Sequence, residues 1–245
     1  MYKIIAIALA ISACVHAAEL PTASAESQGF DSNKLASLLK MIASEGWAVD
    51  SLLLMRNGKV VLDSYFYPYA PEQLHDMRSV TKSVVSTLLG ISLQQNKLRS
   101  LKQPVLPFYP AQARKERDAA KKKLTLAHLL DMRSGLQWNE WPYTPDSTIY
   151  QMYRSANQQQ FVIGQPLTSK PGSEFSYNGG NTNLLSGVIE QAWGTPMAQV
   201  AEKQLFGKLG IKEYRWASDA QGHTIGEATL RLKPHDMARL GHLAG

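Results

Sequence analysis

The sequence predicts an α+β domain in which a β-hairpin near the N-terminus is followed by a succession of helices. Two β-rich runs flank an Asn-Gly pair within residues 51–67, and from residue 79 onward apolar residues recur at helical spacing. Strands that precede helices, instead of alternating with them, argue against a parallel βαβ sheet. The composition is 44% hydrophobic and 19% charged, which excludes a disordered chain and can fill a hydrophobic core.

The 245 residues contain no Pro/Gly/Ser-rich linker, so we expect a single domain after the N-terminal segment. The net charge is +6. The most basic run, Arg114–Lys123, also contains Glu116 and Asp118, a mixture typical of a solvated surface. Because no basic segment is interleaved with aromatic residues in a recognisable motif, we expect no nucleic-acid partner.

The N-terminal segment predicts export. Lys3 precedes the apolar run Ile4–Ala13, and small residues lead up to Ala18, which is the order of a secretory signal. We therefore expect residues 1–17 to be a signal peptide and the protein to be periplasmic. A second interpretation stays open, because the residues that end at Cys14 resemble a bacterial lipobox, in which Cys14 would be lipidated and would anchor the protein to a membrane. Cys14 is the sole cysteine, so no internal disulfide is expected.

The first predicted elements are a helix and a hairpin. Asp31 or Ser32 is a suitable N-cap for a helix that runs to about Glu45, where a glycine ends it. The Asn-Gly pair then predicts a tight turn between strands at 51–55 and 60–67.

Helices dominate the remainder of the chain. Apolar residues at a spacing of 3.6 predict a mostly buried helix over 79–95. Further helices are expected at Thr125–Met132, Thr148–Arg154, Asn183–Ala192, Met197–Leu205 and Pro234–Leu243.

Ser79 and Lys82 are the first candidate catalytic residues. In a helix, positions i and i+3 share a face, so the Lys82 amine is expected beside the Ser79 hydroxyl. A serine is a poor nucleophile until a base takes its proton, and a lysine can be that base when its surroundings favour the neutral amine. The motif alone is weak evidence, since Ser37 and Lys40 also form Ser-x-x-Lys in the middle of the first predicted helix. Ser79 differs because it opens its helix, although a simple N-cap serine would look the same.

Tyr177 is the third candidate. It precedes a glycine-rich turn and a predicted helix, and a tyrosine close to a lysine ammonium can act as a general acid and base. The alternative is a packing tyrosine whose hydroxyl bonds the backbone.

Three ordered motifs resemble those of β-lactamase-related serine hydrolases: Met77–Ser83, Leu124–Leu136 and Pro171–Glu190. That group includes class C β-lactamases, penicillin-binding D-Ala-D-Ala peptidases, family VIII carboxylesterases and 6-aminohexanoate-dimer hydrolases. The likeness extends from about Gly29 to Gly245, so the domain is expected over 29–245. It implies a β-lactamase/transpeptidase-like fold, with an antiparallel sheet flanked by helices and a mostly helical lobe.

The resemblance also implies roles. Ser79 would form an acyl-enzyme, Lys82 would activate it, and Tyr177 would relay the proton to the leaving group and then from water. The usual Tyr-x-Asn motif is altered, because Gly179 stands where the asparagine is expected and Asn178 precedes it. We expect Asn178 and Gly179 to contact substrate. The missing carboxamide argues against β-lactam recognition and for the esterase and 6-aminohexanoate-dimer-hydrolase branch.

Other polar residues are expected to be structural. His128 and Asp131 are predicted to belong to a helix that supports the site, and Asp236 is predicted to stabilise the N-terminus of the last helix. The histidines lack metal-ligand spacing, so no metal and no cofactor are expected.

The third motif of the group, Lys-Thr-Gly or His-x-Gly on a strand, is missing. His223 and His242 each have a glycine one place too late. Since the hairpin alone makes a marginal sheet, we expect the C-terminal strands to be absent, an edge of the sheet to be open, and the chain to be a fragment of a longer hydrolase with weak activity or none.

The predicted function is hydrolysis of an ester or amide in a small molecule, with cell-wall peptide as a further candidate substrate. A D-Ala-D-Ala carboxypeptidase or weak β-lactamase is the alternative enzyme. A non-catalytic domain that binds envelope polymers is the alternative outside enzymes.

Overall fold

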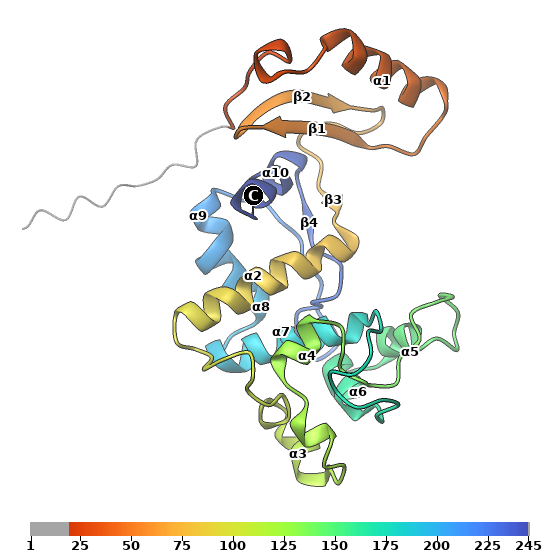
Figure 1. Ribbon diagram of the computed structural model, residues 1–245, viewed down its shortest axis with the longest axis vertical. Coiled ribbons are helices and arrows are strands. Elements are labelled where there is room, and N and C mark those ends of the chain that lie inside the picture. The colour runs from red at the N-terminus through yellow and green to blue at the C-terminus, as the bar shows by residue number, and fades with distance from the viewer. Residues whose placement is uncertain (1–19, 245) are drawn as a thin grey trace, which may run out of the picture.

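The computed structural model describes residues 20–244, and the expected signal peptide and Cys14 lie outside them. Strands β1 (Ser51–Arg56) and β2 (Lys59–Tyr65) form an antiparallel hairpin with a β-bulge between Leu54 and Met55. Helix α1 (Ser32–Ser44) covers one face of the hairpin, and α10 (Pro234–Ala244) lies on the other side (Figure 1). The predicted helix and hairpin are confirmed.

Local sequence explains both elements. The Asp31 carboxylate accepts hydrogen bonds from the backbone N–H groups of Asn33 and Lys34, which caps α1. Asn57 and Gly58 have φ values of 50° and 72°, the left-handed pair that a tight hairpin turn requires.

A helical lobe carries most of the buried core. Helix α2 (Thr81–Gln94) crosses the middle of the molecule and packs on α7 (Gly179–Trp193), which also contacts α4 (Leu126–Leu130) and α6 (Gln158–Gly164) (Figure 1). Leu88 and Ile189 are fully buried between these helices. The remaining helices are α3 (Pro110–Lys115), α5 (Thr148–Arg154), α8 (Met197–Ala201) and α9 (Gly207–Leu209), the last two joined by a π-helical segment, Glu202–Phe206.

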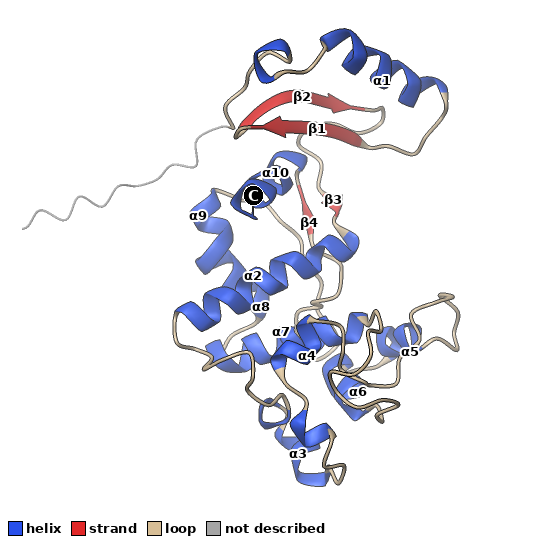
Figure 2. Ribbon diagram, in the orientation of Figure 1, coloured by secondary structure: helices blue, strands red, loops and turns tan. Residues whose placement is uncertain are grey.

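A second, very small sheet joins two segments that are more than 150 residues apart in the sequence. Strand β3 (His75–Asp76) pairs antiparallel with β4 (Arg231–Leu232). Figure 2 shows β1 and β2 at one end of the molecule and β3 and β4 between that hairpin and α2, whereas the other end is helical. Within residues 20–244, β1 is hydrogen-bonded as a strand to β2 alone, so the expected open edge is found in the described part of the chain.

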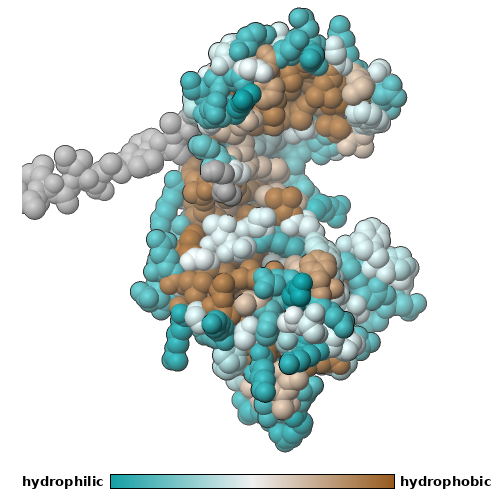
Figure 3. All heavy atoms as spheres, in the orientation of Figure 1, coloured by the Kyte–Doolittle hydropathy of each residue, from teal (hydrophilic) through white to brown (hydrophobic). Residues whose placement is uncertain are grey.

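Apolar surface follows from this arrangement. Figure 3 shows apolar residues gathered at the hairpin end and across the middle of the molecule. A groove of about 510 Å³ lies between α2 and α10 and is lined largely by apolar side chains, among them Val80, Val84, Met237 and Leu240.

The predicted helices are found, with shifted bounds. Helix α7 begins at Gly179, four residues before the expected start. Helices α3 and α6 were not predicted. The expectation of a solvated run at 114–123 is wrong for Lys121, which is buried and lies 3.3 Å from the Glu116 carboxylate.

Among the described residues, no helix combines the length and apolar character needed to cross a membrane.

Candidate active site

Ser79 lies in a short 3₁₀ turn, Arg78–Val80, that leads directly into α2. The turn is held from both sides: the Met77 N–H donates to the Leu230 carbonyl at 2.9 Å, and the Arg78 N–H donates to the Asp76 carboxylate at 2.8 Å. Arg78 has a φ of 47°, a conformation that a residue with a Cβ adopts only at a cost. The strained turn presents the Ser79 side chain to solvent.

Lys82 and Tyr177 meet at the Ser79 hydroxyl. The Lys82 Nζ lies 3.1 Å from Ser79 Oγ, one helical turn along α2, as the spacing predicts. The Tyr177 hydroxyl lies 2.8 Å from the same oxygen, and the Lys82 Nζ is 5.2 Å from the centre of the Tyr177 ring. Three side chains singled out in the sequence are therefore in mutual contact, although Tyr177 is 98 residues from Ser79.

The loop before α7 places Tyr177. The Ser176 N–H donates to the Met132 carbonyl at 2.9 Å, which fastens this loop to the segment after α4. Thr125 and His128 form a reciprocal capping box at the start of α4. His128 thus helps to hold the helix that supports the loop, while Asp131 ends that helix and is exposed.

Asn178 and Gly179 are buried, and most of their polar groups bond within the protein. The Asn178 side-chain oxygen accepts from the Asn181 N–H at 3.1 Å and caps α7, while its amide nitrogen is buried without a partner. The Gly179 N–H donates to the Glu140 carboxylate at 3.1 Å. A substrate contact by these residues stays a prediction.

Glu227 is a site residue that the sequence did not reveal. Its backbone carbonyl accepts a hydrogen bond from Lys82 Nζ at 2.6 Å, and its carboxylate Oε2 lies 3.6 Å from the same nitrogen. The Tyr153 hydroxyl, on α5, donates to the other carboxylate oxygen. Asn183 accepts from the N–H groups of Gly226 and Glu227 at 2.7 and 3.0 Å. No local pattern marks Glu227, since its contacts come from α2, α5 and α7.

Burial dominates the electrostatics around Glu227. It raises the pKa of the Glu227 carboxyl above its ordinary value of 4.5, while the Tyr153 hydrogen bond and the Lys82 charge oppose the rise and Glu140 adds to it. Burial and the nearby Glu227 charge raise the pKa of the Tyr153 hydroxyl. Burial also raises the pKa of Tyr143, with Glu140 as the next cause.

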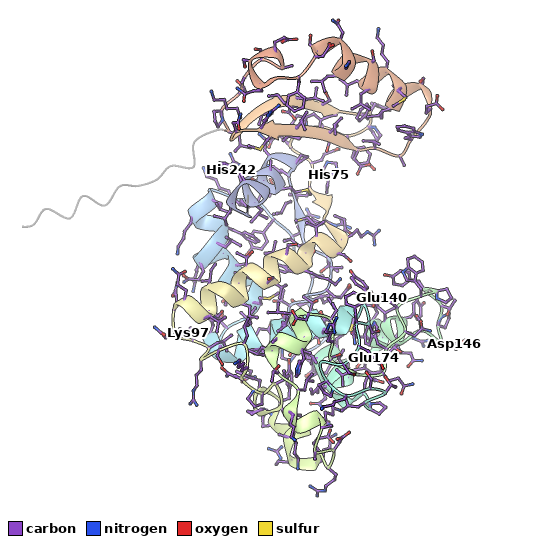
Figure 4. The ribbon with its side chains drawn as sticks, in the orientation of Figure 1. His75, Lys97, Glu140, Asp146, Glu174 and His242 are labelled. Carbon is purple, nitrogen blue, oxygen red and sulfur yellow. The ribbon has the colours of Figure 1, made fainter. Side chains whose placement is uncertain are left out.

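The remaining polar candidates lie elsewhere. His223 bonds to Glu190 at 2.9 Å, and His242 on α10 lies beside the hairpin turn at Gly58. Figure 4 shows His242 at the hairpin end and Glu140 in the helical region. Asp236 is buried in the first turn of α10 and is bound by Arg239 at 2.5 Å. Within residues 20–244, no three His, Cys, Asp or Glu side chains are grouped to hold a metal ion.

The geometry supports proton transfer at Ser79. The phenol oxygen and the amine nitrogen are both within hydrogen-bond reach of the hydroxyl, which is the arrangement of an activated nucleophile.

A sequence profile of the beta-lactamase family matches residues 40–243. The chain belongs to this family.

Known relatives agree with the assignment. The 6-aminohexanoate-dimer hydrolase of Paenarthrobacter ureafaciens is 25% identical in an alignment of 210 residues that covers 81% of this chain and 52% of that protein. A Bacillus anthracis structure assigned as a 6-aminohexanoate-dimer hydrolase has a TM-score of 0.77 at 22% identity, covering 94% of this chain and 63% of that one. EstCE1, described as a hydrolase with promiscuous acyltransferase activity, has a TM-score of 0.69 at 19% identity and covers 85% of this chain and 71% of that one.

These likenesses show a β-lactamase/transpeptidase-like fold, as expected from the motifs. The chain spans about half the length of the curated relative that it matches.

Proposed function

We propose that this chain carries the acyl-transfer site of a serine hydrolase that cleaves an ester or amide through an acyl-enzyme on Ser79. The observation that supports this most is the convergence of Lys82 Nζ and the Tyr177 hydroxyl on Ser79 Oγ, at 3.1 and 2.8 Å. Ser79 and Tyr177 are both exposed, so their contact does not serve the packing of the helical core.

The first half of the reaction makes the acyl-enzyme. Ser79 Oγ attacks the substrate carbonyl carbon, while the hydroxyl proton is taken up by the Lys82–Tyr177 pair that contacts it. The proton passes through Tyr177 to the leaving oxygen or nitrogen as its bond to carbon breaks. The Ser79 backbone N–H, at the start of a helix, is a donor suited to the negative oxygen of the intermediate.

The second half of the reaction hydrolyses the acyl-enzyme and regenerates the free enzyme. A water molecule gives a proton to Tyr177 and attacks the acyl carbon, and the ester oxygen of Ser79 leaves with a proton relayed by the same pair. The products are a carboxylic acid and an alcohol or amine.

The substrate class is proposed from the relatives. The curated relative is named a 6-aminohexanoate-dimer hydrolase, and EstCE1 is described as a hydrolase with promiscuous acyltransferase activity. Gly179, in place of the expected asparagine, argues against a β-lactam substrate. A D-Ala-D-Ala carboxypeptidase stays as the second candidate, because the fold neighbours include a structure titled beta-lactamase/D-alanine carboxypeptidase.

Labelling tests the nucleophile. Intact-mass and peptide mass spectrometry after a fluorophosphonate should find one adduct, on Ser79, that is lost in Ser79→Ala. Ser37→Ala is the matched control, since Ser37 also begins a Ser-x-x-Lys sequence but donates to the Asn33 carbonyl on α1, and it should label like the wild type. An adduct on any other serine would contradict the assignment, and binding without an adduct would favour a non-catalytic domain.

A substrate panel tests the class. p-Nitrophenyl acyl esters, nitrocefin and a D-Ala-D-Ala peptide should be assayed in parallel. Turnover of the esters alone supports the first proposal, whereas turnover of the peptide or nitrocefin supports the second.

We also propose that the protein is exported, with cleavage after residue 17 or with lipid on Cys14. N-terminal sequencing and mass measurement of the secreted protein distinguish the two, and retention of residues 1–17 would exclude both.

A further inference from the structure

The Glu227 carboxylate occupies space that a side chain at position 179 would otherwise reach. A Cβ added to Gly179 would lie 3.3 Å from Glu227 Oε2 and 3.2 Å from a Glu140 oxygen. The same Glu227 oxygen lies 3.6 Å from Lys82 Nζ. Position 179 and Glu227 therefore compete for one space beside the catalytic amine.

The sequence departs from the expected Tyr-x-Asn motif at this position. With glycine at 179, no carboxamide enters the space from α7, and the carboxylate enters it from the segment before β4. Glycine at 179 therefore leaves this space to the carboxylate, which gives the Lys82 amine a buried polar partner.

We propose that Glu227 is a positioning residue that acts through Lys82, and that its carboxylate fills the place beside the amine which a Tyr-x-Asn motif would fill from position 179. This inference rests on the proposed function. Glu227 touches neither Ser79 nor Tyr177 in the structure and is not itself a catalytic residue.

The contacts around Glu227 fix the position of its side chain, as a positioning role requires. Its side chain is 3% exposed, the Tyr153 hydroxyl bonds one carboxylate oxygen, and Asn183 holds its backbone N–H. A lysine has a flexible stem with four carbons, so its amine has a fixed place only when its partners are fixed. The Glu227 carbonyl and carboxylate together hold the amine on the Ser79 side of the site.

The charge on Glu227 depends on the groups that face it. These are Lys82 from α2, Tyr153 from α5 and Glu140 from the loop between α4 and α5. Because burial raises the pKa of Glu227 above 4.5, the carboxylate is lost at a higher pH than an ordinary glutamate would lose it. Activity should fall as Glu227 becomes protonated.

Single substitutions give the first test, with p-nitrophenyl acetate as the probe. Glu227→Gln keeps the shape and removes the charge, and it should lower kcat about 10–100-fold with KM changed less than about twofold, the order expected when a catalytic group is misplaced. The acid limb of the kcat profile should also move or disappear. Glu227→Asp should lie between Glu227→Gln and the wild type.

The second test removes the carboxylate at position 227 and places a carboxamide at position 179 instead. Gly179→Asn alone should lower activity, because its Cβ meets the Glu227 carboxylate. Gly179→Asn combined with Glu227→Ala should be at least about tenfold more active than Glu227→Ala alone, since the added side chain then enters the space that the carboxylate has left beside Lys82. The Glu140 oxygen, 3.2 Å from the added Cβ, is the close contact that remains.

Glu190→Gln is the matched control. Glu190 is a buried carboxylate on α7 that bonds the Thr224 and Met197 N–H groups and does not contact Lys82. It should lower the melting temperature and leave the pH profile unchanged. If Glu227→Gln keeps kcat within about twofold, or if its only effect is a loss of stability like that of Glu190→Gln, the proposal is wrong. If the Gly179→Asn/Glu227→Ala variant fails to fold, the kinetics of the isosteric Glu227→Gln variant alone decide the proposal.

Fluorophosphonate labelling separates this proposal from the one on which it rests. A wild type that does not label at Ser79 refutes the hydrolase assignment. A wild type that labels, together with a Glu227→Gln variant that labels and turns over equally fast, refutes the positioning role alone.

Discussion

Two Ser-x-x-Lys sequences lie in two regions of this molecule and have different surroundings. Ser37 and Lys40 are in the middle of α1, where the Ser37 hydroxyl donates to the Asn33 carbonyl at 2.8 Å and both side chains are exposed. Ser79 lies in a strained turn before α2, where Lys82 and Tyr177 reach its hydroxyl. The comparison shows that both sequences place a lysine three residues after a serine, and that long-range packing brings Tyr177 to Ser79.

The largest difference between the two regions should appear in catalysis. Ser79→Ala should abolish turnover of p-nitrophenyl esters, whereas Ser37→Ala should keep the wild-type rate within about twofold, since it changes an exposed helix face. Steady-state kinetics on both folded variants measures this. An equal loss of turnover in Ser37→Ala would contradict the contrast, because it would show that activity depends on Ser37 as much as on Ser79.

The proton-transfer groups should show the next largest effect. Lys82→Met and Tyr177→Phe should each lower the rate about 10²–10⁴-fold, which is the usual contribution of a positioned acid or base. Their combination should cost less than the product of the two, because they act on one proton. Lys40→Met serves as the control and should leave the rate of turnover unchanged. A folded Tyr177→Phe variant with near-full turnover would make Tyr177 a packing residue.

Packing density gives the third contrast. Leu88 on α2 is fully buried, whereas Leu38 on α1 is half-buried. Leu88→Ala should lower the free energy of unfolding by about 3 kcal/mol through the lost burial and the cavity left behind. Leu38→Ala should cost about 1 kcal/mol. Urea denaturation monitored by circular dichroism measures both, and a larger loss at Leu38 would reverse the contrast.

The smallest effect concerns acid stability in the helical region. Burial alone would raise the pKa of Glu116, but the Asp118 N–H, the Gln112 amide and the Lys121 ammonium together lower it to about 2. The stabilisation by this carboxylate is therefore complete above pH 4.5 and is lost as the pH falls toward 2.

Glu116→Gln should make the melting temperature less sensitive to pH between about 5 and 2. Glu45→Gln, which changes an exposed residue at the end of α1, should leave the slope as it is. Parallel slopes for Glu116→Gln and the wild type would show that Lys121 does not stabilise the charged form of Glu116.

The elements that the sequence predicted are those with a local signal. The cap at Asp31, the Asn-Gly turn and the apolar period of α2 act within a few residues, so pattern reasoning finds them. Helix α6 was missed because its Gln158 and Gln159 side chains are buried and bond to Asn183 and Glu190, which removes the apolar period. Strands β3 and β4 are two residues each and have no pattern to detect.

The same distinction holds for the site. Ser79, Lys82 and Tyr177 were predicted because each lies at a helix start or in a loop with a known motif. Glu227 and Tyr153 were not, because their importance comes from contacts with side chains on other elements. A glutamate in a sequence carries no sign of burial, and Glu227 becomes informative only because its neighbour in the structure is Lys82, the proposed proton-transfer group.

The hydrogen bond from Lys82 to the Glu227 carbonyl joins residues 145 positions apart, and this separation sets an order of events during biosynthesis. At a synthesis rate of about 5–20 residues per second, the ribosome needs roughly 7–30 s to extend the chain from one partner to the other. Throughout that interval α2 exists without the carbonyl that receives its amine, and the turn that presents Ser79 lacks the Leu230 carbonyl that fastens it. Because residues 227 and 230 are synthesised last among these partners, the proposed nucleophile can acquire its full set of contacts only after they have been made, whether the chain folds at the ribosome or after export.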